Sequence, residues 1–325
     1  MSSPCPDAGR GMRNAGRARG TRDWGLGTRA TVQRSREFAA LALPFLLLSA
    51  TAYSTSGSAS RVRRPASLPQ SRVPSPESRA FRVCADPNNL PFSDSSQAGF
   101  ENRIASLIAS ELKEPLEYTW WAQRRGFFRS TVNAGKCDVV MGVPTSLEMV
   151  RTTAPYYRST YVFVTRRSRM TPVRTFDDPR LHRLKIGVHL AGDDGANTPP
   201  AFALATRGIV RNVEGYTLYG DYRQPSPPSK LVEAVSNGDL DVAVVWGPLA
   251  GYYAQHMKHP LDVVPVSPQF DRPFLPFVFD IAIGVRRGDD GLRAQIQHVL
   301  DTKKPEIDRI LKEYGVPRLD LEGQE

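Results

Sequence analysis

The side chains best placed for chemistry in this sequence directly follow short apolar runs. Each run holds four to seven residues and is bounded by turn formers, which is typical of a buried β-strand. In open α/β sheets ligands bind beyond the carboxyl ends of the strands, so the segments after these runs predict a ligand cleft. Those segments are Asp86–Phe92, Gly142–Thr145, His189–Asp194 and Trp246–Pro248.

The first of these segments carries an acidic residue, Asp86, whose pattern has two interpretations. Its carboxylate could bind a cationic or hydroxylated ligand. An Asp that precedes Pro87 and two asparagines more often holds a turn through bonds from its side chain to the backbone. We favour the turn, and we keep Asp86 as a cleft residue together with Asn88, Asn89 and Phe92.

A second set consists of aromatic residues and arginines that could line the cleft or anchor a partner protein. Trp, Tyr and Arg are the residue types that most often anchor protein interfaces. For any single aromatic residue, however, packing in the core is the more common role. The set comprises Trp121, Arg124, Arg125, Tyr156, Tyr157, Arg158 and Trp246, and the residues that end the second apolar run, Gly142 and Pro144, complete the predicted site.

The motifs of metal and catalytic sites are missing or incomplete. Asp193 and Asp194 before Gly195 resemble the start of a calcium loop, but the further acidic ligands at alternating positions are absent. We therefore expect a turn or a backbone contact to a ligand there. The five histidines lack the spacing of metal ligands, and no nucleophile, phosphate-binding or dinucleotide-binding motif is present. The sequence predicts no metal, no cofactor and no catalytic centre.

Two successive α/β units must position these segments. Phe100, Ile104, Ile108 and Leu112 share one face of a helix predicted over residues 100–113, between short strands. A further helix is predicted over Phe127–Ala134. The order strand, helix, strand then repeats in the second half, which predicts parallel strands joined by right-handed crossovers. The repeated elements are Leu184–Val188, Pro200–Arg207, Lys230–Asn237 and Leu240–Trp246.

The connections between the two units define the expected architecture. Two extended segments, Thr160–Val164 and Phe277–Val285, join the units, and two amphipathic helices follow in the tail. We predict an α/β protein of two lobes joined by two crossover segments, a hinged clamshell. Lobe 1 is expected to comprise residues 80–165 and 283–325, and lobe 2 residues 166–282.

The amino-terminal region is typical of an exported protein. An Arg-rich stretch precedes the apolar run Phe38–Ala50, which ends in the small residues Ala50-Thr51-Ala52. This pattern predicts a signal peptide with an Arg-rich extension over residues 1–52, and an uncleaved anchor is the alternative. Residues 53–79 are rich in Ser, Pro and Arg and are expected to form a disordered linker. Past residue 60 no apolar run approaches the length of a membrane span.

The positive charge of the chain is confined to its first quarter. Residues 1–79 hold thirteen arginines and four acidic residues, a net +9 of the +10 carried by all 325 residues. The remaining body is close to neutral and gives no electrostatic basis for binding nucleic acid.

Two cysteines, Cys84 and Cys137, remain in the predicted body. An even pair in an exported domain is a disulfide candidate, and two free buried thiols are the alternative. We favour the bridge only slightly, because the two residues fall at different depths of their predicted strands.

Nine strings of four to eleven residues carry a resemblance to a known family. Those in the first half are Arg82–Phe92, Gly99–Asn102, Tyr118–Trp121, Gln123–Phe127, Cys137–Pro144 and Pro155–Val164, and those in the second half are Gly192–Pro200, Tyr219–Tyr222 and Val245–Tyr252. These strings, five of which have eight or more residues, resemble the MxaJ/XoxJ proteins from about Phe81 to Pro317. This resemblance implies a periplasmic protein with the type II (family 3) solute-binding fold, encoded with PQQ-dependent methanol dehydrogenases and their cytochrome c.

One departure from the wider solute-binding superfamily bears on the ligand. Amino-acid receptors place an Arg about six residues before the motif that appears here as Thr152–Tyr156, where it grips the ligand carboxylate. In this chain the position falls near Ser146, and Arg151 lies next to the motif. The clamp for an amino acid is therefore absent.

The leading functional expectation is a non-catalytic periplasmic accessory protein that binds a PQQ-dependent methanol dehydrogenase, with its cytochrome c as a further partner. A transport receptor for a small polar solute is the alternative, and an exported dehydratase-type enzyme on the same fold is a third. A small-molecule ligand is compatible with the first two. The dehydratase would need an acid poised against a carboxylate-binding Arg, which is missing near Ser146.

Overall fold

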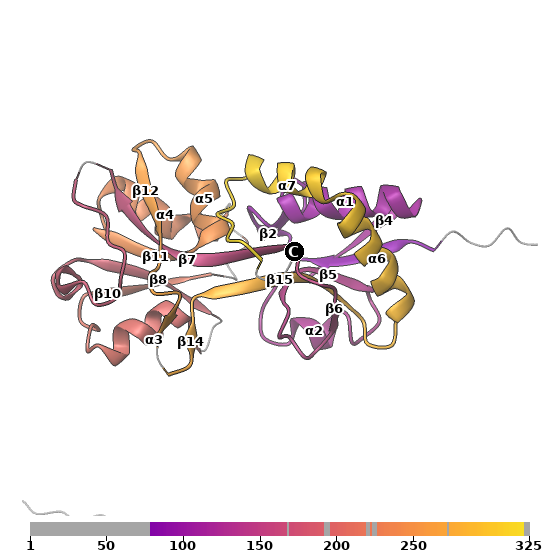
Figure 1. Cartoon of the computed structure of the whole chain (residues 1–325), viewed down its shortest axis with the longest axis horizontal. Helices are drawn as coiled ribbons and strands as arrows, with labels where there is room; N and C mark the ends of the chain where they lie inside the picture. The colour runs from indigo at the N-terminus through magenta and orange to yellow at the C-terminus, as the bar shows by residue number, and fades with distance from the viewer. Residues whose placement is uncertain are drawn as a thin grey trace, which may run out of the picture. The chain divides into compact units, whose positions relative to one another are not determined.

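Figure 1 shows a computed structural model, which describes residues 79–167, 169–191, 196–218, 222, 226–271 and 273–321. The expected signal peptide, the linker up to residue 78, Asp193 and Asp194 lie outside the described residues. In the part of the chain that is described, no helix has both the length and the apolar character needed to cross a membrane.

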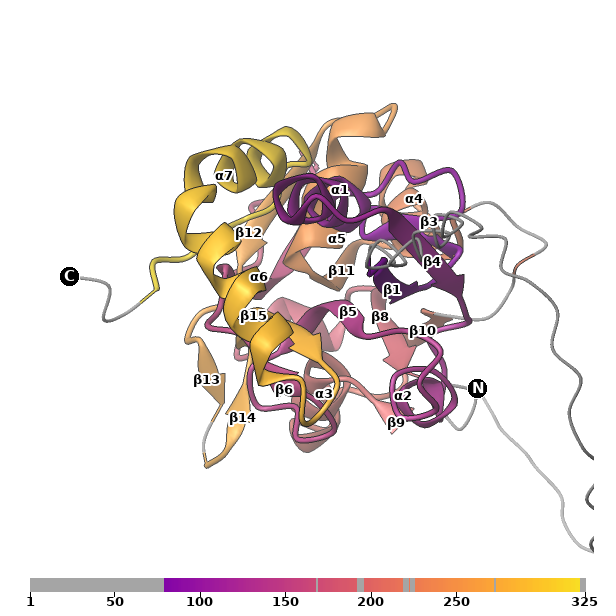
Figure 2. The same ribbon diagram turned by 90° about the vertical axis from the view of Figure 1, so that its right-hand side faces the viewer.

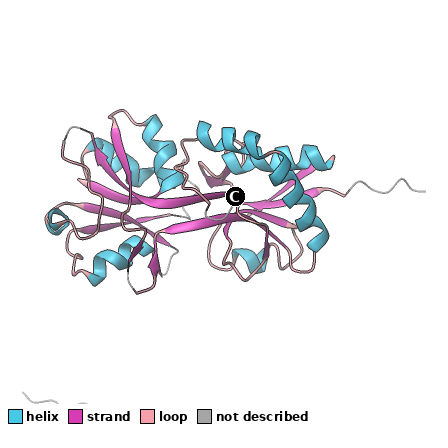
Figure 3. Cartoon of the chain, in the orientation of Figure 1, coloured by secondary structure: helices cyan, strands magenta, loops and turns pink. Residues whose placement is uncertain are grey.

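The central strands follow one another in the order β10-β8-β11-β7-β15-β5-β1-β4. Helices lie on both sides of these strands in each half of the fold (Figure 3). The strands of the first half are β1 (Phe81–Ala85), β4 (Leu116–Trp120), β5 (Val139–Pro144) and β6 (Arg151–Thr152), with the hairpin β2 (Asn88–Asn89) and β3 (Ser93–Asp94). Those of the second half are β8 (Ile186–Ala191), β9 (Ala196–Asn197), β10 (Val213–Thr217), β11 (Val242–Trp246) and β12 (Leu261–Pro265), with the hairpin β13 (Phe270–Asp271) and β14 (Leu275–Pro276).

Two long antiparallel strands, β7 (Tyr157–Arg166) and β15 (Val278–Val285), connect the halves. The start of β7 pairs with the start of β15, with Thr160 opposite Val278. The rest of β7 pairs with β11 and β12, while the rest of β15 pairs with β5. The predicted α/β clamshell with two crossover segments is therefore confirmed. We propose the lobe boundaries at 165/166, near the end of β7, and at 282/283, within β15.

The helices of lobe 1 are α1 (Phe100–Leu112), α2 (Phe127–Ser130), α6 (Asp290–Thr302) and α7 (Lys304–Glu313). The helical spacing of apolar residues in α1 buries Phe100, Ile104 and Ile108 against the sheet and against α6 and α7. Helix α1 begins at Gly99, whose backbone N–H donates to Asn102 Oδ1 at 3.2 Å. Figure 2 shows α6 and α7 beside α1.

Helix α2 is shorter than the predicted helix over Phe127–Ala134. The hydroxyl of Thr131 donates to the carbonyl of Phe127 at 2.6 Å. Thr131 has φ and ψ values of −121° and −89°, outside the helical region. A side chain that bonds the backbone in this way competes with the helix, which ends at Ser130.

The helices of lobe 2 cover the remaining faces of the sheet. Leu231, Val235 and Leu249 pack with β7 and β11 in one buried cluster. A second cluster lies on the other face, where Leu204 of the first helix of lobe 2 packs with β8 and β11. These helices are α3 (Pro199–Thr206), α4 (Lys230–Asn237) and α5 (Gly247–His256), with short 3-10 turns at Pro179–His182 and Pro227–Ser229.

The segment after α7 returns to the crossover strands and contacts both lobes. Leu319 forms a β-bridge with Arg158, and the hydroxyl of Ser159 donates to the carbonyl of Pro317 at 2.6 Å. On α5, a Cβ at Gly251 would collide with the carbonyl of Gly315, so the close approach requires glycine. We call residues 314–321 the tail segment.

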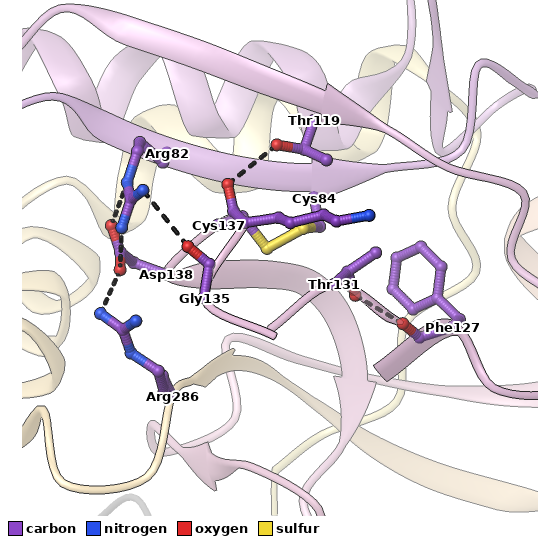
Figure 4. Close-up of a disulfide and its surroundings, with 10 residues drawn as sticks. Arg82, Cys84, Thr119, Phe127, Thr131, Gly135, Cys137, Asp138 and Arg286 are labelled. Carbon is purple, nitrogen blue, oxygen red and sulfur yellow. Dashed lines mark hydrogen bonds and ion pairs between the residues drawn. A yellow bond between two sulfur atoms is a disulfide. The ribbon is translucent and has the colours of Figure 1, made fainter. Parts of the chain in front are cut away.

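A disulfide joins Cys84 on β1 to Cys137, with their Cα atoms 5.6 Å apart (Figure 4). The offset that we expected between the strands exists, because Cys84 lies opposite Val140. The bridge forms because Cys137 precedes β5 and is not held to the register of that strand. Both cysteines are buried.

Beside the disulfide, two arginines converge on the buried carboxylate of Asp138. Arg82 donates from Nε and from a terminal nitrogen, each at 2.8 Å, in a bidentate pair. Arg286, at the end of β15, donates to the same carboxylate at 2.5 Å (Figure 4). The pair fixes the start of β5 between β1 and β15.

Candidate functional site

A cavity of about 270 Å³ lies between the two lobes. Its size suits a ligand smaller than a typical drug molecule. Lobe 1, lobe 2 and both crossover strands contribute to its wall. The lining residues are Asn89, Phe92, Glu101, Gln123, Met141, Gly142 and Pro144 from lobe 1, His189, Thr198, Leu218, Trp246 and Leu249 from lobe 2, and Tyr161, Phe279 and Ile281 from the crossover strands.

The lobe 1 wall is built around the contact between Glu101 and Gly142. Glu101 lies in the first turn of α1, and Gly142 lies in β5 with a φ of +64°. A Cβ at Gly142 would overlap the carboxylate oxygen Oε1 of Glu101. Glycine at this position therefore satisfies the left-handed backbone and also leaves space for the carboxyl group.

Burial raises the pKa of Glu101 to about 8, because no hydrogen bond or ion pair to another described residue offsets the loss of water. The neighbours that interact with it electrostatically are the phenols of Tyr118, Tyr156 and Tyr157, whose own pKa values burial raises. The carboxyl group is thus mostly protonated at neutral pH when the cavity is empty.

On the opposite wall, His189 lies in β8, directly after the strand that the sequence predicted over Leu184–Val188. Its ring is hydrogen-bonded to the backbone of Pro228, which can offer only a carbonyl acceptor, while Nε2 has no partner among the described residues. Burial lowers the pKa of His189 to about 4, so the ring is neutral at pH 7. The neutral ring donates from Nδ1 and leaves a free acceptor lone pair at Nε2.

A second unpartnered acceptor lies on the hairpin β2–β3. Asn89 is 4% exposed and its Oδ1 has no partner among the described residues. Its amide nitrogen donates to Gln123 Oε1 at 3.3 Å, which orients the side chain. Buried polar atoms are nearly always paired, so unpaired acceptors in a cavity wall indicate where a ligand donor would bind.

Three aromatic rings cover the cavity at the crossover strands. Trp246 contacts Tyr161 and Phe279 edge to face, with ring centroids 5.3 Å and 5.8 Å apart. Tyr161 and Phe279 contact each other at 6.4 Å. We call these three residues the aromatic trio. Because each comes from a strand that pairs with its neighbour, the sheet itself fixes their arrangement.

Asp86 holds the turn that we favoured from the sequence, and its carboxylate also contacts lobe 2. Its Oδ1 accepts from the N–H of Asn88 at 2.8 Å, which makes the turn, and its Oδ2 accepts from the N–H of Gln123 at 2.7 Å. The phenol of Tyr222 in lobe 2 also donates to Oδ2 at 2.7 Å. Asp86 is 2% exposed, and its carboxylate accepts three hydrogen bonds from described residues.

Two further hydrogen bonds close the cleft on the same side. The N–H of Ser226 donates to Asn88 Oδ1 at 3.0 Å, and the hydroxyl of Tyr253 donates to the carbonyl of Leu90 at 3.0 Å. The described conformation is thus a closed one, with the loop after β1 bonded to lobe 2.

The predicted site residues fall into three groups. Those that line the cavity are Asn89, Phe92, Gly142, Pro144 and Trp246, while Asp86 and Asn88 hold the closed cleft. Three on the segment after β4 are exposed and are not lining residues: Trp121, whose ring lies under the Lys136 ammonium at 4.1 Å, Arg124, which lies over the Tyr222 ring at 5.5 Å, and Arg125. The others that do not line the cavity are Tyr156 and Tyr157, which are buried in the core of lobe 1, and Arg158, which pairs with Asp280 at 2.6 Å.

Sequence reasoning did not name Glu101, Gln123 or His189 as site residues. His189 nevertheless begins the segment His189–Asp194, which we predicted to border the ligand cleft because it follows a strand. Glu101 gave a weaker signal, an acid at the start of the first helix. Its role depends on Gly142, which is forty-one residues away.

Among the described lining residues there is no Arg or Lys. Ser146 and Arg151 lie in a separate surface depression together with Arg287 and Arg293. Across the described residues there is also no cluster of three or more His, Cys, Asp or Glu arranged to hold a metal ion.

Comparison with known proteins agrees with this architecture. The sequence profile of the bacterial extracellular solute-binding proteins, family 3, matches residues 81–317. The chain is 33% identical over 258 residues to the protein MoxJ of Methylorubrum extorquens, a match that covers 76% of this chain and 84% of that one.

Two solved structures resemble the fold over both lobes. The periplasmic binding protein XoxJ from Methylobacterium extorquens AM1 superimposes with a TM-score of 0.61 at 34% identity, over 74% of this chain and all of that one. MxaJ from Methlophaga aminisulfidivorans MPT superimposes with a TM-score of 0.62 at 26% identity, again over 74% and 100% of the two chains.

Proposed function

The chain belongs to the family 3 bacterial extracellular solute-binding proteins, in the group of MoxJ, MxaJ and XoxJ, and we propose that it is a non-catalytic periplasmic accessory protein of a PQQ-dependent methanol dehydrogenase. In this role it acts in the maturation or activation of the dehydrogenase. The observation that carries the proposal is the similarity to MoxJ and XoxJ across both lobes, at about one third identity.

The chemistry of the cavity supports this proposal against the amino-acid receptors of the same fold. A buried carboxylate needs a charged fork to offset its desolvation, and the described lining residues include no Arg or Lys. The same absence argues against a dehydratase, which would need an acid opposed to such an Arg.

The surface of lobe 2 offers a region suited to a protein partner. Phe274, between β13 and β14, is 85% exposed, and Phe270 and Phe202 are also exposed. Helix α3, which carries Phe202, packs against β14, so the three rings belong to one part of the surface. Figure 2 shows the hairpin β13–β14 projecting from the fold. Exposed aromatic residues are the side chains that most often anchor interfaces.

The test is co-purification from the periplasm of the native host. We expect the tagged protein to retain the methanol dehydrogenase, and the variant Phe274→Ser to retain at least tenfold less. Met149→Ser, which alters an exposed apolar residue of lobe 1, should retain as much as the unaltered protein. If no dehydrogenase is retained and a free amino acid binds at micromolar concentration, the transport receptor replaces the accessory role.

A further inference from the structure

We propose that the interlobe cavity is a binding site for a small organic cation, a primary ammonium held by Glu101, Asn89 and His189 beneath the aromatic trio. This inference does not depend on which macromolecule the protein binds, because it rests on the cavity alone.

The first argument is the hydrogen-bonding character of the wall. Asn89 Oδ1 and His189 Nε2 are buried acceptors without partners among the described residues. The Glu101 carboxyl group adds a third acceptor beside Gly142. A primary ammonium carries three N–H donors and no acceptor, so it matches this set of three acceptors.

Two further polar groups of the wall are engaged within the protein. The hydroxyl of Thr198 donates to the carbonyl of His189 at 2.8 Å, and Gln123 Oε1 accepts from Asn89. These bonds hold the unpartnered acceptors in place without competing for the ligand. The site is thus preorganised, which lowers the entropic cost of binding.

The second argument is charge. The titratable groups that face Glu101 are Tyr118, Tyr156 and Tyr157 on its own side and His189 across the cavity. The phenols have raised pKa values and the imidazole has a lowered one, so all four are neutral near pH 7. No lining residue that the structure describes supplies a counter-charge to Glu101. A bound cation would supply it.

The third argument is the aromatic trio. Trp246 is the strongest partner for cation–π attraction, and Tyr161 and Phe279 adjoin it at 5.3 Å and 5.8 Å. Phe92 lies in the same cavity wall and packs at 5.4 Å against Phe100 of α1. Aromatic faces combined with one carboxylate form the arrangement that recognises alkylammonium groups.

These groups also predict a proton linkage. Burial raises the pKa of Glu101 to about 8, so the empty cavity holds a proton at pH 7 that a bound cation displaces. Apparent affinity for a primary ammonium that stays charged over this pH range should therefore rise about tenfold from pH 6 to pH 7 and level off above pH 8.

The experiment is titration calorimetry of the full chain with butylammonium, 1-butanol and butyrate, three ligands of similar size that differ in charge. We expect butylammonium to bind at least tenfold more tightly than the other two. Repeating the titration at pH 7 in phosphate and in HEPES, which differ in ionisation enthalpy and contain no primary ammonium, should show release of close to one proton per ligand.

Matched variants assign the effect to Glu101. Glu101→Gln should remove the preference for butylammonium and the proton release, while Glu114→Gln, at the far end of α1, should keep both. Equal affinity for 1-butanol, preference for butyrate, or no binding of butylammonium would each overturn the proposal. If Glu101→Gln fails to fold, the proton release measured on the unaltered protein decides alone, because a site without an ionising carboxyl group releases none.

Discussion

The phenol of Tyr222 donates a 2.7 Å hydrogen bond to Oδ2 of Asp86, a residue that precedes it by 136 positions. Asp86 follows β1 in lobe 1, and its other bonds run to the backbone of its own lobe. This bond therefore joins the two lobes through a buried carboxylate. The guanidinium of Arg124 lies over the ring of the same Tyr222.

Replacing Tyr222 with Phe should weaken the closed conformation. The change removes one donor from a buried carboxylate that keeps its two backbone donors, so we expect a loss of about 1–3 kcal/mol in the free energy of unfolding. Urea denaturation measures it. Tyr252→Phe is the matched control, because the Tyr252 ring stacks on Tyr314 and this contact survives the change. Equal stability of the two variants would show that the Tyr222 bond contributes nothing.

Removing the disulfide should lower the free energy of unfolding by more than the change at Tyr222 does. Cys84 and Cys137 are 53 residues apart, and closing a loop of this length restricts the unfolded chain by about 4 kcal/mol in the chain-entropy model. We expect the double variant Cys84→Ser, Cys137→Ser to lose about 2–5 kcal/mol of stability, measured by urea denaturation. The unaltered protein denatured with a reductant should lose a similar amount. No difference between oxidised and reduced protein would mean that the bridge does not form in solution.

The stability of the protein should depend on pH through Glu101. Burial raises its pKa from 4.5 to about 8, so the folded protein keeps a proton that the unfolded chain releases. This contribution is fully present below pH 4.5 and is lost as pH rises through 8, by an amount on the order of 5 kcal/mol. Glu101→Gln should flatten the profile of unfolding free energy between pH 5 and 9.

A second pH dependence and a control variant complete this experiment. His189 acts at the other end of the range, because its pKa is lowered to about 4 and stability should fall as pH drops below about 6.5. Glu117→Gln, which changes an exposed carboxyl group on β4, should leave the profile as it is. An unchanged slope in Glu101→Gln would assign the pH dependence to other groups.

Free amino acids should not bind at micromolar concentration. Burying an α-carboxylate without a cationic partner costs several kcal/mol, against the ~8 kcal/mol that micromolar affinity represents. Calorimetry with a panel of neutral, acidic and basic amino acids checks this, with butylammonium titrated in parallel. A micromolar amino acid would show that a cationic group from elsewhere in the chain reaches the cavity.

The sequence predicted the elements well and the cavity in part. Phe100, Ile104 and Ile108 sit on one face of α1 because apolar spacing is a local property, and the same holds for the buried strands β5 and β11. Asn89 and Trp246 were found because strand ends mark ligand sites. Glu101 was missed because its character comes from tertiary burial and from a glycine in another element.

The opposite error affected Tyr156 and Tyr157. Both residue types are common at interfaces, and nothing in their local sequence distinguishes an exposed pair from a buried one. The structure packs both rings in the core of lobe 1, 4.9 Å apart. Neighbours that decide their exposure, such as Phe100, lie more than fifty residues away in the chain.

The tail segment changes the motions that the two crossover strands allow between the lobes. Two strands alone could twist as well as bend, but the tail segment is bonded to β7 at Arg158 and Ser159 and lies against Gly251 of α5. Any separation of the lobes has to draw Tyr314 away from Tyr252, whose rings are stacked at 5.6 Å. A fluorescent label placed near Leu321 would thus move with the crossover strands and report their rotation. The same label on a helix of either lobe would report only the position of that lobe.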